Sequence, residues 1–167
     1  MDVVVVVQDA MVTPASGDAL ARVYREQGAK LWRSLLAYTG DREMASDAMA
    51  EALAQALGRG DAVQSPERWV WRAAFRIAAG ELRNRSRHVQ ISSMDSTPYE
   101  MPEPAVDLIR ALARLSPNQR AVAVLHLYAD YRTRDVARIL GISQTTVRVH
   151  LSQARRRLRM LLEDEDG

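Results

Sequence analysis

The sequence of 167 residues contains no cysteine, which excludes disulfides, thiolate metal sites and a cysteine nucleophile. Its three histidines lie far apart, and none forms a metal-ligand pair at helical spacing. Aromatic residues make up only 5%, so the core has to rest on Leu, Val, Ala and Met. The longest aliphatic run, residues 3–7, is far shorter than the ~20 apolar residues of a membrane span. Met1-Asp2 also lacks the basic start of a secretory signal, so we expect a soluble cytoplasmic protein without membrane insertion.

Lysine is almost absent as well, because Lys30 is the one lysine among 23 basic residues. The net charge of +2 conceals two arginine-rich blocks. Residues 68–88 hold six arginines against one glutamate, and residues 132–159 hold eight arginines against one aspartate. Two separated basic blocks are typical of two contact surfaces for a polyanion. Two solvated helix faces would give the same pattern, so charge alone leaves both interpretations open.

Apolar spacing predicts helices over 19–38, 42–57 and from Ser65-Pro66 to about residue 86, with no sustained strand alternation. Asp18 is the candidate N-cap of the first helix. We expect residues 1–17 to form a tail and residues 18–87 to form a three-helix domain.

Residues 88–106 are rich in Ser and Pro and carry no helical period, which indicates a flexible linker between domains. A second domain, residues 107–167, is expected to hold helices near 105–114, 117–129, 132–139 and 144–162. The predicted fold is therefore all-α, with two small helical domains and a helix-turn-helix in the second.

The helix-turn-helix prediction rests on residues 132–151. Ala137 is small where two helices approach, and Gly141 suits a left-handed turn. Ser143 can cap the next helix, and Val147 and Leu151 face inward. An ordinary helical hairpin is the alternative, but the combination of these features favours DNA binding. The residues expected to face a major groove are Gln144, Thr145, Thr146, Arg148, Val149 and Ser152.

Three segments carry a resemblance to a known family. Leu115-Ser-Pro-Asn-Gln-Arg120, Ala137-Arg-Ile-Leu-Gly-Ile-Ser143 and the stretch from Thr146 to Leu158 resemble region four of bacterial sigma factors. In the first domain, the helix from Ala45 to Leu57 and the Trp69-Val-Trp-Arg stretch with its arginine-rich end resemble region two. Two such domains in that order, joined by a linker, are similar to the extracytoplasmic-function (ECF) group of the sigma-70 family.

The resemblance implies a transcription initiation factor that binds core RNA polymerase at the β′ clamp helices and the β flap. An anti-sigma factor is a usual further partner in the family. The polymerase-binding positions that carry over are Met44, Asp47, Ala48 and Glu51. Asp47 and Glu51 lie one helical turn apart, which a solvated pair would also explain. A metal site formed with Glu43 is a third interpretation, and it lacks the histidine partners that such carboxylate sites use.

The resemblance also implies two promoter contacts. The loop 59–67 would form a pocket for a base of the minus-ten element, and the basic residues along the melted strand would be Arg72, Arg76, Arg83, Arg85 and Arg87. Arg76 stands where the family usually has Asn, and Gly80 falls near a usual Asp, so base preference is not set by the resemblance. The minus-thirty-five element would be read by the major-groove residues together with Gln153, Arg155 and Arg156.

Two other functions compete with this one. The first is a helix-turn-helix regulator that never engages polymerase, and the second is a degenerate sigma-like protein that titrates a partner. We expect no enzyme, no cofactor and no metal, because no catalytic triad, nucleotide loop or metal cluster can be assembled from the residues present.

Overall fold

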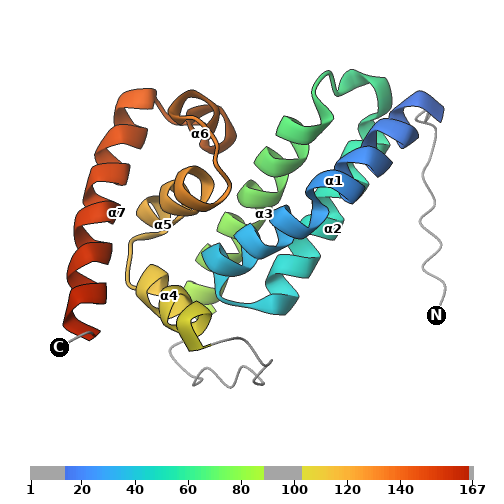
Figure 1. Cartoon of the computed structure of the whole chain (residues 1–167). Helices are drawn as coiled ribbons and strands as arrows, with labels where there is room; N and C mark the ends of the chain where they lie inside the picture. Colours follow the sequence, from blue (N-terminus) through green and yellow to red (C-terminus); the bar gives the residue numbers. More distant parts are fainter. Residues whose placement is uncertain (1–13, 89–102, 166–167) are drawn as a thin grey trace.

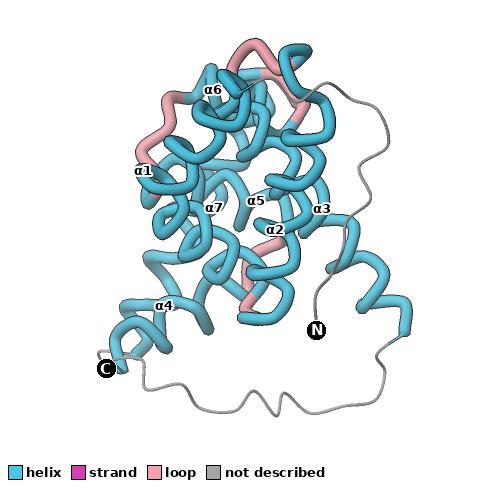
Figure 2. Tube along the Cα trace, turned by 90° about the vertical axis from the view of Figure 1, so that its right-hand side faces the viewer, coloured by secondary structure: helices cyan, strands magenta, loops and turns pink. Residues whose placement is uncertain are grey.

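The computed structural model describes residues 14–88 and 103–165. These residues form helices without any strand, as Figure 2 shows, which confirms the all-α prediction. The elements are α1 (Pro14–Thr39), α2 (Arg42–Arg59), the 3-10 turn η1 (Gly60–Ala62), α3 (Pro66–His88), α4 (Glu103–Ala113), α5 (Pro117–Ala123), the π-helical turn η2 (Val124–Tyr128), α6 (Thr133–Leu140) and α7 (Gln144–Glu165).

Two predicted boundaries differ from the structure. Asp18 lies inside α1 and not at its N-cap, because the helix begins at Pro14. Proline fits the first turn of a helix, where its missing N–H has no intrahelical partner to lose. In addition, α4 begins at Glu103, so the last residues of the predicted linker 88–106 are helical. The division of the chain into domains stays a prediction.

Helices α1, α2 and α3 form a three-helix bundle (Figure 1). The inner face of α2 consists mostly of alanines: Ala45, Ala48, Ala52 and Ala56 are buried, together with Met44. Their small side chains let α2 lie close to both neighbours, and larger residues of α1 and α3 such as Leu35 and Val70 fill the core. Asp47 and Glu51 on the other face of α2 remain exposed.

Helices α4 to α7 form the second bundle, with α5 and α6 packed against the long α7 (Figure 1). Its core contains Val122, Leu125, Val136 and Val147, none of which is exposed. Ser116 and Gln119 start α5 with a reciprocal capping box, which satisfies two backbone donors that the helix itself leaves unpaired.

The two bundles also pack against each other. Helix α1 contacts α4, α5 and η2, while α3 contacts α6. A row of aromatic rings crosses this junction: Tyr38 lies 5.2 Å from Phe75, and Trp71 lies 6.2 Å from Phe75 and 5.0 Å from Tyr131. Trp71 is fully buried among these rings. The described helices therefore share one continuous hydrophobic core.

Arg120 is the polar link across the same junction. Its Nε donates to the Leu112 carbonyl at 3.0 Å, and its Nη2 reaches the carbonyls of Ala113 and Leu115, at the end of α4 and just beyond it. Its Nη1 crosses to the other bundle and donates to the Tyr38 carbonyl at 2.9 Å. Carbonyls at a helix C-terminus lack intrahelical partners, so one planar guanidinium ties α4, α5 and α1 together.

Two glycines allow a matched test of backbone conformation. Gly80 lies within α3, where an added Cβ would meet only Arg83 Nη2 at 4.0 Å, whereas Gly141 has φ +69°. We expect Gly80→Ala to raise the free energy of unfolding by about 0.5–1 kcal/mol. Gly141→Ala should lower it by about 1–2 kcal/mol, because a side chain is strained in the left-handed region. Urea denaturation of both variants checks this, and a stabilised Gly141→Ala would contradict the helix-turn-helix geometry.

Candidate nucleic-acid interface

The helix-turn-helix has the geometry that the sequence predicts. Gly141 ends α6 in the left-handed region, and the Ile142 amide donates to the Ala137 carbonyl at 3.1 Å. Ser143 caps α7 by accepting a hydrogen bond from the Thr146 amide at 3.1 Å. Val147 and Leu151 are buried against the rest of the bundle. This arrangement orients α7 with its polar face outward.

The outer face of α7 is strongly basic. A hollow of about 400 Å³ is lined there by Arg148, Ser152, Arg155, Arg156 and Arg159, together with Leu151. At about 100° per residue, Arg148, Ser152, Arg155 and Arg159 fall on one side of the helix. We call this set the α7 basic face. Gln144, Thr145 and Val149 are exposed near its N-terminal end.

Two of the predicted residues are engaged elsewhere. Thr146 Oγ1 shares a hydrogen bond of 2.8 Å with Ser143 Oγ at the cap. Gln153 Oε1 accepts a hydrogen bond of 3.1 Å from Gln119 Nε2 of α5. Both residues lie about 140–160° from Arg148 around the helix axis. The structure therefore separates these two residues from the α7 basic face.

A second row of arginines follows α3. Arg72, Arg76 and Arg83 are exposed and fall within about 40° of one another around the helix. Arg68 extends this row by one turn at its N-terminal end. We call these four residues the α3 arginine stripe. The side chain of Arg87 lies outside the described part of the structure.

Arg85 does not belong to the stripe. It lies on the opposite side of α3, where its Nη1 donates to Asp41 Oδ2 at 2.7 Å. Asp41 is also the N-cap of α2, since its Oδ1 accepts a hydrogen bond of 2.9 Å from the Met44 amide. Burial alone would raise the pKa of Asp41, but the Met44 amide and the Arg85 guanidinium hold that pKa below its ordinary value. Arg85 is therefore a structural partner of α2.

The loop between α2 and α3 lies beside the start of the stripe. Gly60, Asp61, Val63 and Gln64 line a hollow of about 260 Å³ with residues of the first turns of α1. Ser16 Oγ donates to Asp61 Oδ1 at 2.8 Å, which ties this loop to α1. The loop therefore borders a small, partly open hollow with mostly apolar walls, next to a basic helix.

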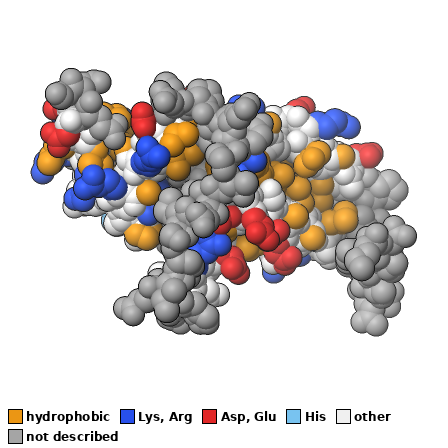
Figure 3. All heavy atoms as spheres, turned by 90° about the horizontal axis from the view of Figure 1, so that it is seen from below, with side chains coloured by type: hydrophobic (Ala, Val, Ile, Leu, Met, Phe, Trp, Pro, Cys, Tyr) orange, Lys and Arg blue, Asp and Glu red, His pale blue; other side chains and the backbone are white. Residues whose placement is uncertain are grey.

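Helix α2 presents an acidic surface. Asp47 and Glu51 are exposed along a groove of about 750 Å³ between α2 and α3, whereas Met44 and Ala48 lie largely buried at its base. Glu51 Oε1 accepts a hydrogen bond from Gln55 Nε2 at 2.8 Å. In Figure 3, acidic side chains lie beside hydrophobic ones over the half formed by α1–α3, whereas basic side chains gather toward the α7 end.

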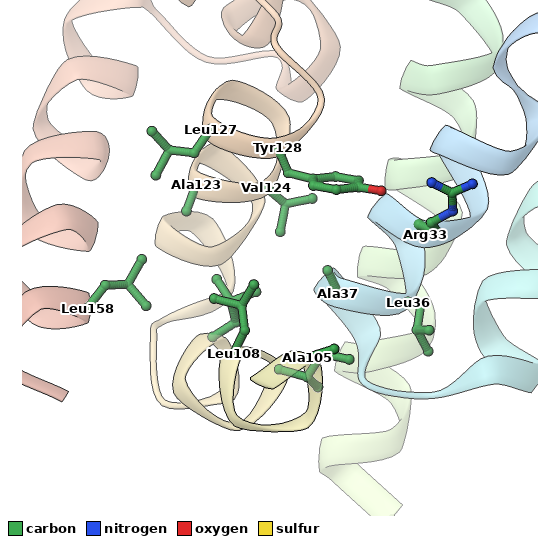
Figure 4. A pocket seen from close by; sticks show the side chains of 12 residues that line it. Arg33, Leu36, Ala37, Ala105, Leu108, Ala123, Val124, Leu127, Tyr128 and Leu158 are labelled. Atoms are coloured by element: carbon green, nitrogen blue, oxygen red, sulfur yellow. The ribbon is translucent and has the colours of Figure 1, made fainter. Parts of the chain in front are cut away.

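An apolar groove of about 350 Å³ lies where the two bundles meet. Its lining comes from α1, α4, α5, η2 and α7, and Figure 4 shows Leu36, Leu108, Leu127 and Leu158 around one shared space. Leu108, Leu127 and Tyr128 are each about half exposed. Contiguous exposed apolar side chains of this kind mark an interaction surface.

The described residues contain no group of His, Asp or Glu that could hold a metal ion. Glu43, Asp47 and Glu51 thus do not form a metal site in the described structure. None of the described helices is long and apolar enough to cross a membrane.

A helix-turn-helix with a basic outer face, combined with a second arginine-rich helix, defines a DNA-binding protein. The family model "Sigma-70, region 4" matches residues 105–158. The ECF RNA polymerase sigma factor SigL of Mycobacterium tuberculosis is 33% identical over 165 residues, which cover 90% of this chain and 93% of SigL. SigM of the same organism is 30% identical, with 92% of this chain and 83% of SigM covered. The chain belongs to the ECF RNA polymerase sigma factors.

Two solved structures have the same fold. The sigma factor RpoE of Bartonella quintana, in complex with the anti-sigma factor NepR, aligns with a TM-score of 0.74 at 23% identity, covering 87% of this chain and 97% of that one. CnrH, in complex with the cytosolic domain of CnrY, aligns with a TM-score of 0.69 at 18% identity, covering 90% of this chain and 91% of that one.

Sequence reasoning missed Arg68 and Arg159 as members of the two basic surfaces. Both could have been found by helical spacing, because Arg68 lies four residues before Arg72 and Arg159 lies four residues after Arg155. It also missed Tyr131 and Glu67, which join the bundles because the Tyr131 hydroxyl donates to Glu67 Oε1 at 3.1 Å. This contact has no local sequence signal.

Comparison of arginines on opposite sides of α3 tests the stripe. Removal of one phosphate contact should reduce the salt slope of single-stranded DNA binding by about 0.7. We expect this reduction for Arg76→Ala and for Arg83→Ala. Arg85→Ala should leave the slope unchanged and lower the melting temperature, because Asp41 loses its partner. Fluorescence anisotropy with an oligo-dT probe over a range of salt concentrations measures the slopes. An equal loss of slope in Arg85→Ala would contradict this division of α3.

Proposed function

We propose that this sigma factor binds core RNA polymerase, reads both promoter elements and captures the melted strand. The observation that carries the proposal is the presence in one chain of three separate surfaces: the acidic face of α2, the α3 arginine stripe and the α7 basic face. Each surface has the chemistry that one of these tasks requires. The chain itself would perform no bond chemistry, and the polymerase would hold the active site.

Core polymerase would dock on α2 through Asp47 and Glu51, with Met44 and Ala48 buried beneath them. Asp47 and Glu51 are exposed on one face, and this face borders a broad groove. Charged rims around an apolar centre are typical of protein interfaces, where the charges steer the encounter and fix its orientation. Basic and apolar side chains on a polymerase helix would complement this surface.

The minus-ten element would be held by the loop 59–67 and by Arg72, Arg76 and Arg83. The hollow between this loop and α1 would receive an unstacked base, and the stripe would follow the strand's phosphates. Arg87 would continue the row by its helical spacing. Arg85 was among the residues expected to contact the minus-ten element, but the proposed site leaves it out because it is paired with Asp41.

The minus-thirty-five element would be read by α7 in the major groove. Arg148 would contact a base, because a bidentate arginine–guanine pair gives the strongest discrimination in that groove. Gln144, Thr145, Val149 and Ser152 would lie against neighbouring bases, and Arg155, Arg156 and Arg159 would contact phosphates. Thr146 would support the cap and Gln153 would brace α5, given their present hydrogen bonds.

An anti-sigma factor is a further proposed partner. RpoE of Bartonella quintana was solved in complex with the anti-sigma factor NepR. The apolar groove between the bundles offers this chain a surface of suitable chemistry, because an amphipathic helix buries its apolar side in such grooves.

Capture of core RNA polymerase tests the docking surface. We expect the wild-type protein to retain core polymerase on affinity beads, and the double variant Asp47→Arg with Glu51→Arg to lose at least tenfold in retention. Two reversed charges oppose the steering and the contact together. The matched control is Glu163→Arg with Asp164→Arg, which makes the same charge change at the exposed end of α7.

The control should bind as the wild type does. If the wild type binds duplex DNA without binding core polymerase, a helix-turn-helix regulator replaces the initiation factor. If the wild type binds neither duplex DNA nor core polymerase, a sigma-like protein that titrates a partner replaces the initiation factor.

Selection from a randomised duplex library tests α7. We expect Arg148→Ala to lose preference at one base pair, by about 1–3 kcal/mol of discrimination. Arg155→Ala should weaken binding to all sequences alike and reduce the salt slope by about 1. The matched control is Arg157→Ala, since Arg157 is exposed about 180° from Arg148 around α7. Sequencing of the bound fraction gives the outcome, and an unchanged preference in Arg148→Ala rejects its role in base reading.

A further inference from the structure

The apolar groove formed by α1, α4, α5, η2 and α7 has the size of a small-molecule site. Its volume of about 350 Å³ lies within the ~300–1,000 Å³ that ligand pockets occupy. Such a volume has room for roughly a dozen groups the size of a water molecule, and a methylene group is of similar size. An α-helix is about 10 Å across, so it could place only side chains there. The interior of the groove therefore fits one hydrocarbon chain of about twelve carbons.

The walls of the groove separate hydrocarbon from polar groups. Ten of the twelve lining residues are Ala, Val, Leu or Ile, and none is acidic. Arg33 is the one charged residue, and Tyr128 supplies the one hydroxyl. Figure 4 shows the Tyr128 ring extending from η2 toward Arg33 of α1, whereas Leu127 and Leu158 lie at the opposite end. The groove thus has a cationic, hydrogen-bonding end and an apolar end.

Arg33 is available to a ligand. It is exposed, and none of the ion pairs within the described structure includes it. A guanidinium forms charge-assisted hydrogen bonds with both oxygens of a carboxylate, and a phenolic hydroxyl nearby can donate another. Because the groove has no acidic residue, an anionic head group complements it and a cationic one does not.

The π-helical turn η2 keeps the groove open to solvent. It brings Leu127 and Tyr128 to the same groove although they are consecutive in sequence. These two side chains are about half exposed, as is Leu108 of α4. π-helical turns are frequent at functional sites. A hydrocarbon chain in the groove would cover these three side chains, and removal of apolar surface from water favours binding.

We propose that this groove is a binding site for a free long-chain fatty acid. The hydrocarbon tail would lie among α4, η2 and α7, and the carboxylate would be bound by Arg33 and the Tyr128 hydroxyl. The inference rests on the proposed function in one respect, since the anti-sigma helix proposed for the same groove would compete with the acid. Binding of the acid itself is measurable with the chain alone.

Chain length tests the size of the site. Isothermal titration calorimetry of the full chain would compare octanoate, decanoate, laurate and myristate, each below its micelle-forming concentration. We expect the affinity to increase by about fourfold per methylene up to laurate, because each methylene leaves water, and to level off at myristate. A continued increase at myristate would indicate adsorption to an open surface and would overturn the site.

Substitutions test the two ends of the groove. Arg33→Gln should weaken laurate binding by about fivefold, as expected for an exposed ion pair, and leave binding of uncharged dodecanol unchanged. Arg22→Gln is the matched control, because Arg22 is exposed on the same side of α1 about 16 Å away and should bind laurate as the wild type does. Ala105→Phe fills the groove and should weaken both ligands at least tenfold. Melting temperatures check that each variant is folded.

Three results would overturn the proposal. The first is an equal loss of laurate binding in Arg22→Gln and Arg33→Gln. The second is a concentration-dependent dimer that does not bind laurate, which would mean that a second copy covers the groove. The third is retention on phosphatidylglycerol vesicles without binding of free laurate, which would mean a membrane surface.

The site and the proposed function fail separately. If laurate binds as expected and the wild type does not retain core polymerase, the site stands and the proposed function fails. If core polymerase is retained and laurate does not bind, the site fails and the proposed function stands.

Discussion

An indole ring that is fully buried needs neighbours on every side, and Trp71 obtains one of them from the other half of the chain. Phe75 of the same helix covers one side, and Tyr131, sixty residues further on, covers an edge. The first bundle is therefore incomplete without the second. Arg120 strengthens the same dependence, since its guanidinium joins the end of α4 to the carbonyl of Tyr38 in α1. Trp71 and Arg120 therefore help to set the relative position of the two basic surfaces, together with the contacts of α1 and α3 with the second bundle.

Different sides of helix α3 pack in the core, support α2 and present arginines to solvent. Its buried side, with Val70, Trp71 and Phe75, forms the core. Arg85 supports the start of α2 through Asp41, and the arginine stripe faces outward. An aliphatic helix with isolated charges could not do this. The near absence of lysine suits such a helix, because a guanidinium forms directed hydrogen bonds to carboxylates, carbonyls and phosphates alike.

The sequence predicts those structural features that depend on residues close together along the chain. Helical periodicity, the Gly141 turn, the Ser143 cap and the inward Val147 and Leu151 are local patterns, and the structure confirms them. The start of α1 was misassigned because Asp18 and Pro14 are both acceptable signals and only the whole helix decides between them. The side taken by Arg85 follows from helical spacing once the helix is continuous. The contact of Tyr131 with Trp71 has no local signal at all, because it depends on the packing of two bundles.

The π-helical turn at Val124–Tyr128 is equivalent to one extra residue inserted into an α-helix. Loss of a single residue there would let the segment wind as a regular helix and would rotate everything after it by about 100°. Tyr131 would then point away from Trp71, whereas α6 and α7 would keep their own capping and packing. Deletion of one residue would thus keep both basic surfaces and remove the contact between the two bundles. Family members that differ by one residue in this turn would differ in how their halves associate while reading DNA with the same helices.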